Sequence, residues 1–343
     1  MIGNSSPAKK LVVKFSYPSK WDVEWDVPQS VLKGSPALSG LWNNCHFHVN
    51  SDTQACDYWV VYEDIDKYLF ETADCPRENT IFVTSEEKTM WSYEPAYLAQ
   101  FGVIFTSRSD IMHPRVVKGP YLCPWQIKRN YDELKDVKPI AKQADLSVIC
   151  SDNTYLEGHK KRYALVNRLK GHFKDQLHWF GRGEQTIKDK WDGLAPYRYS
   201  VAIENASHRD YFTEKINDCF LAHTMPIYWG CPNIEDYFLA DSLIRIDIAD
   251  YCGTIRTIER AIEENWYEKS FAAIEASRSR VLEQYQFFPL LANLITHLHA
   301  TDSTGCKGKT LIRSKSFFSS NFTLRQKAYR MKQTVALRLQ GYR

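Results

Sequence analysis

The sequence lacks any run of the about 18–20 apolar residues that cross a bilayer, and no apolar block follows Lys9 and Lys10. We therefore expect neither a membrane span nor a secretory signal. The nine cysteines are odd in number and form no C-x-x-C pair, which is typical of reduced thiols and not of a disulfide framework. Glycine (15 residues) and proline (14 residues) are too scarce for a collagen-like or low-complexity chain. These absences predict a globular, cytoplasmic protein.

The sequence does contain enough apolar material for two domains of ordinary size. Of its 343 residues, 44% are hydrophobic and 25% are charged, the profile of a globular protein with a large core. Aromatic residues reach 14%. Aromatic rings often line sites for sugars, although ordinary core packing is the simpler explanation.

The C-terminal segment 306–343 contains no acidic side chain but ten Lys or Arg. Residues 1–305 hold the other 34 basic side chains against 41 acidic ones, so a mildly acidic body precedes a basic tail. Interleaved Phe and Leu predict a basic amphipathic segment, peripheral on the anionic inner face of a membrane. A solvated tail, or a segment that folds back onto the first domain, is the alternative. A nucleic-acid partner is not expected. A protein that binds nucleic acid spreads basic charge over a folded face, whereas the body of this chain is mildly acidic.

Short apolar runs alternate with stretches of helical length, which predicts an α/β protein with parallel strands buried on both faces. Apolar residues recur with a helical period in residues 162–173 and 214–224. The expected strands are residues 11–15, 59–62, 81–84, 103–106, 146–150, 178–180, 200–203, 226–229 and 243–246. The charge-dense segment 128–145 indicates a boundary, so we expect domains over 1–140 and 141–305, followed by the tail 306–343.

Polar residues after one expected strand form a candidate anion site. Glu204 and Asn205 follow the strand 200–203, and Thr213 is a good N-cap for a helix that begins with Glu214 and Lys215. The free N–H groups of that first turn favour an anion, and Lys215 can neutralise a phosphate. Glu214 can accept hydrogen bonds from a ribose diol. A capped helix without a ligand has the same pattern and remains the alternative.

The stretch ENASHRDYFTEK, residues 204–215, resembles the nucleotide-sugar signature of the α1,3/α1,4-fucosyltransferases, glycosyltransferase family 10. The following AHTMPIYWGCPNIEDYF is similar to the strand and turn after that signature, most closely in bacterial members. Ile203 stands where the family usually has Phe. The N-terminal 80 residues carry little of the resemblance, which leaves the acceptor open.

The resemblance implies a GT-B fold, in which two Rossmann-like domains face each other across a crevice and the C-terminal domain holds GDP-fucose. It implies that Tyr211, Glu214 and Lys215 contact the donor nucleotide, with Glu214 at the ribose and Lys215 at phosphate. Glu204 and Asn205 would lie on the donor-sugar side. Arg162 looks like the diphosphate clamp, with Lys161 or a solvated basic helix face as the alternative.

The same resemblance places a general base in the N-terminal domain. Bacterial members have Thr-Gly-Glu after a strand, and here Thr84 and Ser85 precede Glu86. Glu86 would take the proton of the acceptor hydroxyl, with Glu87 and then Glu94 as competitors. We expect no required cofactor and no metal site, because cations and N–H groups can stabilise the departing diphosphate.

Other motifs compete with this reading. The stretch WVVYEDID places Asp64 and Asp66 after a strand, as in the D-x-D of metal-dependent glycosyltransferases. D-x-D is frequent by chance, and the donor signature lies far from it in the sequence. The CHFH and HLH sequences have no partners at zinc spacing.

The sequence thus predicts an inverting enzyme that moves L-fucose from GDP-fucose to an acceptor oligosaccharide, at the 3- or 4-OH of N-acetylglucosamine or glucose. Transfer of another GDP-linked 6-deoxysugar is the alternative within the same class. A non-catalytic sugar-nucleotide or glycan-binding protein on the same scaffold is the alternative from a different class.

Overall fold

The computed structural model describes residues 10–24, 26–27, 29–67, 69–85, 92–152, 154, 157–301 and 308–318, together with residues 335, 339 and 341. The chain forms two compact units. The first comprises residues 1–24, 39–119 and 288–343, and the second comprises residues 25–38 and 120–287.

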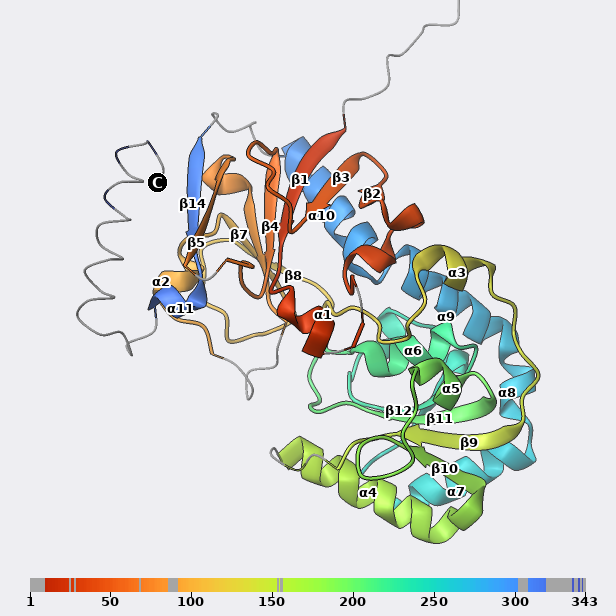
Figure 1. Ribbon diagram of the computed structural model, residues 1–343. Helices are drawn as coiled ribbons and strands as arrows, with labels where there is room; N and C mark the ends of the chain where they lie inside the picture. The colour runs from red at the N-terminus through yellow and green to blue at the C-terminus, as the bar shows by residue number, and fades with distance from the viewer. Residues whose placement is uncertain are drawn as a thin grey trace, which may run out of the picture. The chain divides into compact units, whose positions relative to one another are not determined.

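The first unit is built on a seven-stranded sheet with the order β2-β3-β1-β4-β6-β7-β8 (Figure 1). Its neighbouring strands are parallel except for β2 and β3. All residues of the central β4 are buried, as expected for a strand covered on both faces. The strands are β1 (Leu11–Ser16), β2 (Leu41–Trp42), β3 (Cys45–Val49), β4 (Tyr58–Tyr62), β6 (Thr80–Val83), β7 (Val103–Thr106) and β8 (Val116–Lys118).

The C-terminal part of the chain contributes to this first unit. Phe288, in α10 (Phe287–Thr301), packs edge-on against Phe47 of β3, with ring centroids 5.2 Å apart. Strand β14 (Lys309–Arg313) pairs antiparallel with β5 (Phe70–Asp74), and α11 (Lys315–Phe318) follows it. Three further helices are α1 (Lys20–Glu24), α2 (Pro95–Leu98) and the 3-10 helix η3 (Arg77–Asn79).

The second unit has a five-stranded, wholly parallel sheet with the order β10-β9-β11-β12-β13. The strands are β9 (Ala144–Ile149), β10 (Leu177–Phe180), β11 (Tyr197–Ile203), β12 (Met225–Trp229) and β13 (Ile244–Arg245). In chain order this sheet reads 2-1-3-4-5, so the strand order reverses between β9 and β11. In doubly wound sheets, ligands bind beyond the carboxyl ends of the strands at this reversal.

Helices of the second unit follow its strands. The helices are α3 (Tyr131–Asp136), α4 (Glu157–Phe173), α5 (Lys190–Leu194), α6 (Glu214–Leu221), α7 (Tyr251–Glu263), α8 (Trp266–Lys269) and α9 (Phe271–Glu283). Short 3-10 turns are η1 (Leu32–Gly34), η2 (Pro36–Leu38), η4 (Lys174–Gln176), η5 (Ile234–Asp236) and η6 (Ala240–Ser242). The apolar face predicted for α4 is buried, from Leu165 to Phe173. Among the helices that the structure describes, none combines the length and the apolarity that crossing a membrane requires.

Each expected strand overlaps a strand of the structure, and the α/β class with parallel sheets is confirmed. The division of the chain differs from the expected 1–140, 141–305 and 306–343. The chain passes between the units more than once, because residues 25–38 belong to the second unit and residues from 288 onward return to the first. Residues 309–318 are therefore part of a folded unit, as the fold-back alternative proposed, and not part of a separate tail.

Candidate functional site

A small pocket lies in the second unit at the carboxyl ends of β9 and β11, where the strand order reverses. Four charged side chains contribute to the lining, those of Arg162, Lys190, Lys215 and Asp218. The pocket is thus lined by charge at the place where this fold binds ligands.

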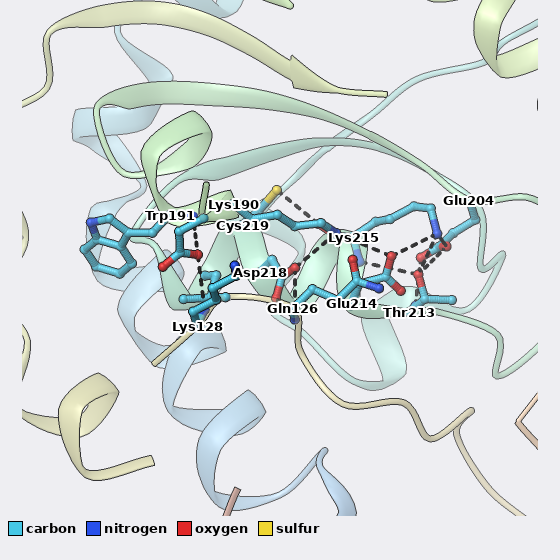
Figure 2. Close-up of polar contacts among 12 residues, drawn as sticks. Gln126, Lys128, Lys190, Trp191, Glu204, Thr213, Glu214, Lys215, Asp218 and Cys219 are labelled. Atoms are coloured by element: carbon cyan, nitrogen blue, oxygen red, sulfur yellow. Dashed lines mark hydrogen bonds and ion pairs between the residues drawn. The ribbon is translucent and has the colours of Figure 1, made fainter. Parts of the chain in front are cut away.

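Glu204 follows β11 and braces the start of α6. Its side chain is fully buried, and its two carboxylate oxygens accept hydrogen bonds from the Thr213 backbone N–H at 2.8 Å and the Thr213 hydroxyl at 2.7 Å (Figure 2). Burial raises the pKa of Glu204 above its usual value. These bonds fix the N-cap residue, so Glu204 closes the loop between β11 and α6.

Lys215 lies in the first turn of α6 between two carboxylates. Its Nζ is 3.4 Å from Glu214 Oε1 and 3.5 Å from Glu204 Oε2, and it donates to the Thr213 hydroxyl at 3.1 Å. Burial alone lowers the pKa of Lys215, but the Glu214 and Glu204 carboxylates raise it above its usual value. Lys215 is therefore a cation in the first turn of a helix, at the positive end of the helix dipole.

Glu214 has a second lysine partner that the sequence did not indicate. Lys190 Nζ, at the start of α5, is 3.5 Å from Glu214 Oε1 and 3.3 Å from Asp218 Oδ2 (Figure 2). Burial raises the pKa of Glu214, but Lys215 and Lys190 outweigh it and bring this pKa to about 2. Glu214 is thus an ionised hydrogen-bond acceptor, as recognition of a diol requires.

Asp218 is the third carboxylate of this cluster and is buried, with a side chain only 1% exposed. It accepts a hydrogen bond from the Gln126 backbone N–H at 3.0 Å, and burial raises its pKa. The sequence does contain a signal for Asp218. It is a charged residue among apolar neighbours, and it lies four positions after Glu214, on the same face of the helix. Lys190 carries no such local signal, because only the fold brings it to α6.

Arg162 connects α4 to the end of β11. Its Nη1 donates to Asn205 Oδ1 at 2.8 Å, while its buried Nε has no hydrogen-bond partner within the described parts of the chain. A Cβ atom at Gly158 would lie 1.9 Å from the Asn205 carbonyl oxygen, so only glycine allows α4 to approach this closely. Lys161 is exposed, whereas Arg162 lines the pocket.

His159 adds an imidazole to the same end of α4. It is buried, and among the described residues its Nδ1 has no hydrogen-bond partner. Burial, together with the charges of Arg162 and Lys215, lowers the pKa of His159, which keeps the ring neutral at pH 7. The sequence did not indicate this residue either.

Tyr211 is buried in a cluster of rings before α6. Its ring centroid is 5.1 Å from that of Tyr121 and 4.6 Å from that of His208. The structure thus gives Tyr211 a packing role, and its contact with a donor nucleotide stays a prediction.

The residues expected to supply the base are only partly described. Glu86 and Glu87 lie outside the described residues, and Glu94 is exposed at the N-cap of α2. Ser85, just before Glu86, donates to Glu63 Oε2 from its backbone N–H at 3.0 Å and from its hydroxyl at 2.6 Å. The role of Glu86 stays a prediction.

The competing D-x-D residues have protein partners in the first unit. Asp64 Oδ1 accepts from the Lys315 backbone N–H at 3.1 Å, and Asp66 accepts from Ser19 N–H at 2.8 Å and from its hydroxyl at 2.7 Å. Across the described residues, no group of three or more His, Cys, Asp or Glu side chains could hold a metal ion.

The second unit has recognisable relatives. Residues 141–271 match the sequence model described as glycosyltransferase family 10 (fucosyltransferase), C-terminal part. This segment is therefore similar in sequence to the C-terminal part of the family 10 fucosyltransferases. The matched segment holds all six residues expected on the donor side, from Arg162 to Lys215.

The curated relatives match over part of their length. An α-(1,3)-fucosyltransferase of Helicobacter pylori is 29% identical over 96 residues, which is 26% of this chain and 20% of that protein. Human α-(1,3)-fucosyltransferase 7 is 28% identical over 96 residues, 27% of this chain and 28% of that protein. A fucosyltransferase-like protein of Arabidopsis thaliana is 41% identical over 118 residues, 34% and 23% of the two chains. The alignments thus span between a fifth and three tenths of these relatives.

Two solved glycosyltransferase structures align with most of the chain. A crystal structure of an α1,3-fucosyltransferase with GDP has 17% sequence identity and a TM-score of 0.47, covering 84% of this chain and 94% of that one. A glycosyltransferase from Rickettsia africae has 9% identity and a TM-score of 0.47, covering 87% and 100% of the two chains.

Proposed function

We propose that this protein transfers L-fucose from GDP-fucose to a hydroxyl of an acceptor glycan, the 3- or 4-OH of N-acetylglucosamine or glucose, with inversion at the sugar carbon. The observation that carries the proposal is the cluster of the buried Glu204 with the partly buried Glu214 and Lys215 at the start of α6, within the segment that matches the family 10 model. The names of the curated relatives support the choice of sugar.

The donor half of the mechanism follows from the charges of the second unit. Lys215, Arg162 and the first turn of α6 would take the diphosphate, and Glu214 would accept hydrogen bonds from the ribose. Because these groups stabilise the charge that develops on the departing GDP, the reaction has no need of a resident metal. Asn205, held by Arg162, would lie on the fucose side together with Glu204, which also keeps the loop closed, and Tyr211 would contact the donor nucleotide.

The acceptor half requires a base, which we assign to Glu86. A single carboxylate that takes the acceptor proton is enough for inversion, since the diphosphate leaves without protonation. We also propose that basic residues after position 318 attract the protein to an anionic membrane surface, where glycan acceptors on lipid carriers gather.

The proposal is tested by a screen of the purified protein with GDP-fucose, other GDP-linked 6-deoxysugars, GDP-mannose and UDP-galactose, with released nucleotide as the readout. We expect release of GDP from GDP-fucose only when an acceptor with a terminal N-acetylglucosamine or glucose is present. Greater turnover of another GDP-6-deoxysugar would assign a different donor. Tight binding of GDP without turnover of any donor would indicate a non-catalytic binding protein.

Lys215→Ala serves as the variant for this screen, with Lys161→Ala as its matched control. Loss of a charge-assisted phosphate contact should weaken GDP binding by roughly 2–3 kcal/mol, measured by calorimetry. Lys161 is exposed one position before Arg162, so its replacement should leave the affinity unchanged. Unchanged GDP affinity in a folded Lys215→Ala protein would exclude Lys215 from the site.

A further inference from the structure

One carboxylate oxygen of the donor site is shared by two lysines. Glu214 Oε1 lies 3.4 Å from Lys215 Nζ and 3.5 Å from Lys190 Nζ (Figure 2). The two lysines come from different elements, α6 and α5, and both line the pocket. Glu214 would therefore keep one ion pair if the other lysine moved to bind a ligand.

Lys190 is fixed in place by its surroundings. It begins α5, whose N-cap residue Asp189 accepts hydrogen bonds from the backbone N–H groups of Trp191 and Lys128, both at 3.1 Å. Its ammonium group lies 3.3 Å from Asp218, which is itself bonded to the Gln126 backbone. Lys190 thus bridges two carboxylates on successive turns of α6.

The two lysines differ in what else they can reach. Lys215 lies in the first turn of α6, where the helix dipole favours an anion, and the present acceptors of its ammonium group are Thr213, Glu204 and Glu214. A diphosphate there would draw Lys215 away from Glu214. A buried carboxylate that loses its partner is strongly destabilised, unless a second cation remains. Lys190 is that cation.

We propose, on the basis of the proposed function, that Lys190 is a positioning residue for the donor nucleotide. It holds the Glu214 carboxylate in place for the ribose diol and so allows Lys215 to turn to the diphosphate. Lys190 itself touches neither the ribose nor the phosphates in this scheme. Its effect on the donor passes through Glu214.

The test uses Lys190→Met in the full chain, with Lys188→Met as the matched control. Lys188 is exposed two positions earlier, so its replacement removes the same charge without touching the cluster. We expect Lys190→Met to weaken GDP binding by about 10-fold to 100-fold, the effect of losing a charged hydrogen-bonding partner. Lys188→Met should bind GDP as the wild type does. Lys190→Arg, which keeps the charge, should recover most of the affinity.

A second nucleotide separates positioning from a general loss of structure. The wild type should prefer GDP to 2′,3′-dideoxy-GDP, because Glu214 binds the diol. In Lys190→Met this preference should shrink, whereas a merely structural effect would weaken both nucleotides equally. In a Glu214→Gln background, Lys190→Met should change GDP affinity less than threefold, because the neutral amide needs no cation.

The outcomes distinguish this inference from the proposed function. A wild-type protein that binds no GDP would overturn the proposed function, and with it the role of Lys190. A wild type that binds GDP, beside a Lys190→Met protein with the same affinity and the same diol preference, would overturn the inference alone. Equal losses from Lys190→Met in the wild-type and Glu214→Gln backgrounds would also overturn it, since Lys190 would then act on the fold through Asp218.

Discussion

The side chain of Lys315 forms an ion pair with Glu63, 252 residues earlier in the sequence. Glu63 follows β4 in a left-handed conformation, with φ of 66°, and its side chain is 1% exposed. Its other carboxylate oxygen accepts hydrogen bonds from Ser85 and from the Tyr93 hydroxyl at 2.6 Å. Glu63 therefore binds the chain on both sides of residues 86–91 and forms its ion pair with the C-terminal segment.

Lys315→Met should destabilise the protein, because it removes the cation that pairs with the buried Glu63 carboxylate. Breaking a buried pair from one side costs about 3–5 kcal/mol, and we expect the free energy of unfolding to fall by that order. Denaturant unfolding measures it, with Lys309→Met in the exposed part of β14 as the control. Equal stability of Lys315→Met and the wild type would show that the pair contributes nothing. The double variant Glu63→Gln/Lys315→Met should recover part of the lost free energy of unfolding, because the neutral amide needs no counter-charge.

This ion pair also shows what the sequence could not predict. The strand β11, the N-cap Thr213 and the first turn of α6 follow from local patterns of a few residues, and the structure confirms each of them. Strand β14 is basic, amphipathic and far from β5 in the sequence, so nothing local indicates their pairing. Local sequence patterns do not indicate Lys190 for the same reason, since its partners Glu214 and Asp218 lie on another element. Local chemistry predicts elements and caps, whereas long-range partners depend on the tertiary fold.

The second prediction concerns how far the C-terminus can be truncated before the first unit loses stability. A chain that ends near residue 300 lacks β14 and α11, which should expose the edge of β5 and cause aggregation. A chain that ends after Phe318 keeps both elements and should unfold at the same temperature as the full chain. It loses six Lys or Arg, each worth about 1 kcal/mol near an anionic surface, so its binding to anionic liposomes should disappear.

Flotation with liposomes of increasing phosphatidylserine content, at low and high salt, measures this effect. Binding of the full chain should fall as salt rises. If the full-length protein does not bind anionic liposomes at low salt, the basic residues after Phe318 have no membrane role.

The stability of the protein should depend on Glu214 in acid. The folded-state pKa of about 2 lies below the usual value of 4.5, because Lys215 and Lys190 outweigh the effect of burial. Glu214 therefore contributes stability that is present above about pH 4.5 and is lost as the pH falls toward 2. Glu214→Gln should be less stable than the wild type at pH 7, and the difference should shrink below pH 4.5. A difference that is constant between pH 7 and pH 3 would contradict the pairing of Glu214 with the two lysines.

The base assignment is the prediction that separates chemistry from binding. Glu86→Gln should keep the wild-type affinity for GDP, because all the donor-side residues lie in the second unit. Its turnover should fall by ~10²–10⁴-fold, the usual contribution of a positioned general base. Glu87→Gln is the matched control, since it removes the same charge one position later. If Glu87→Gln loses activity and Glu86→Gln retains it, the assignment is wrong by one residue. If both variants remain active, the base lies elsewhere. The carboxylate of Glu63 is already bound by Ser85, Tyr93 and Lys315. The exposed Glu94 would therefore be the next carboxylate to replace.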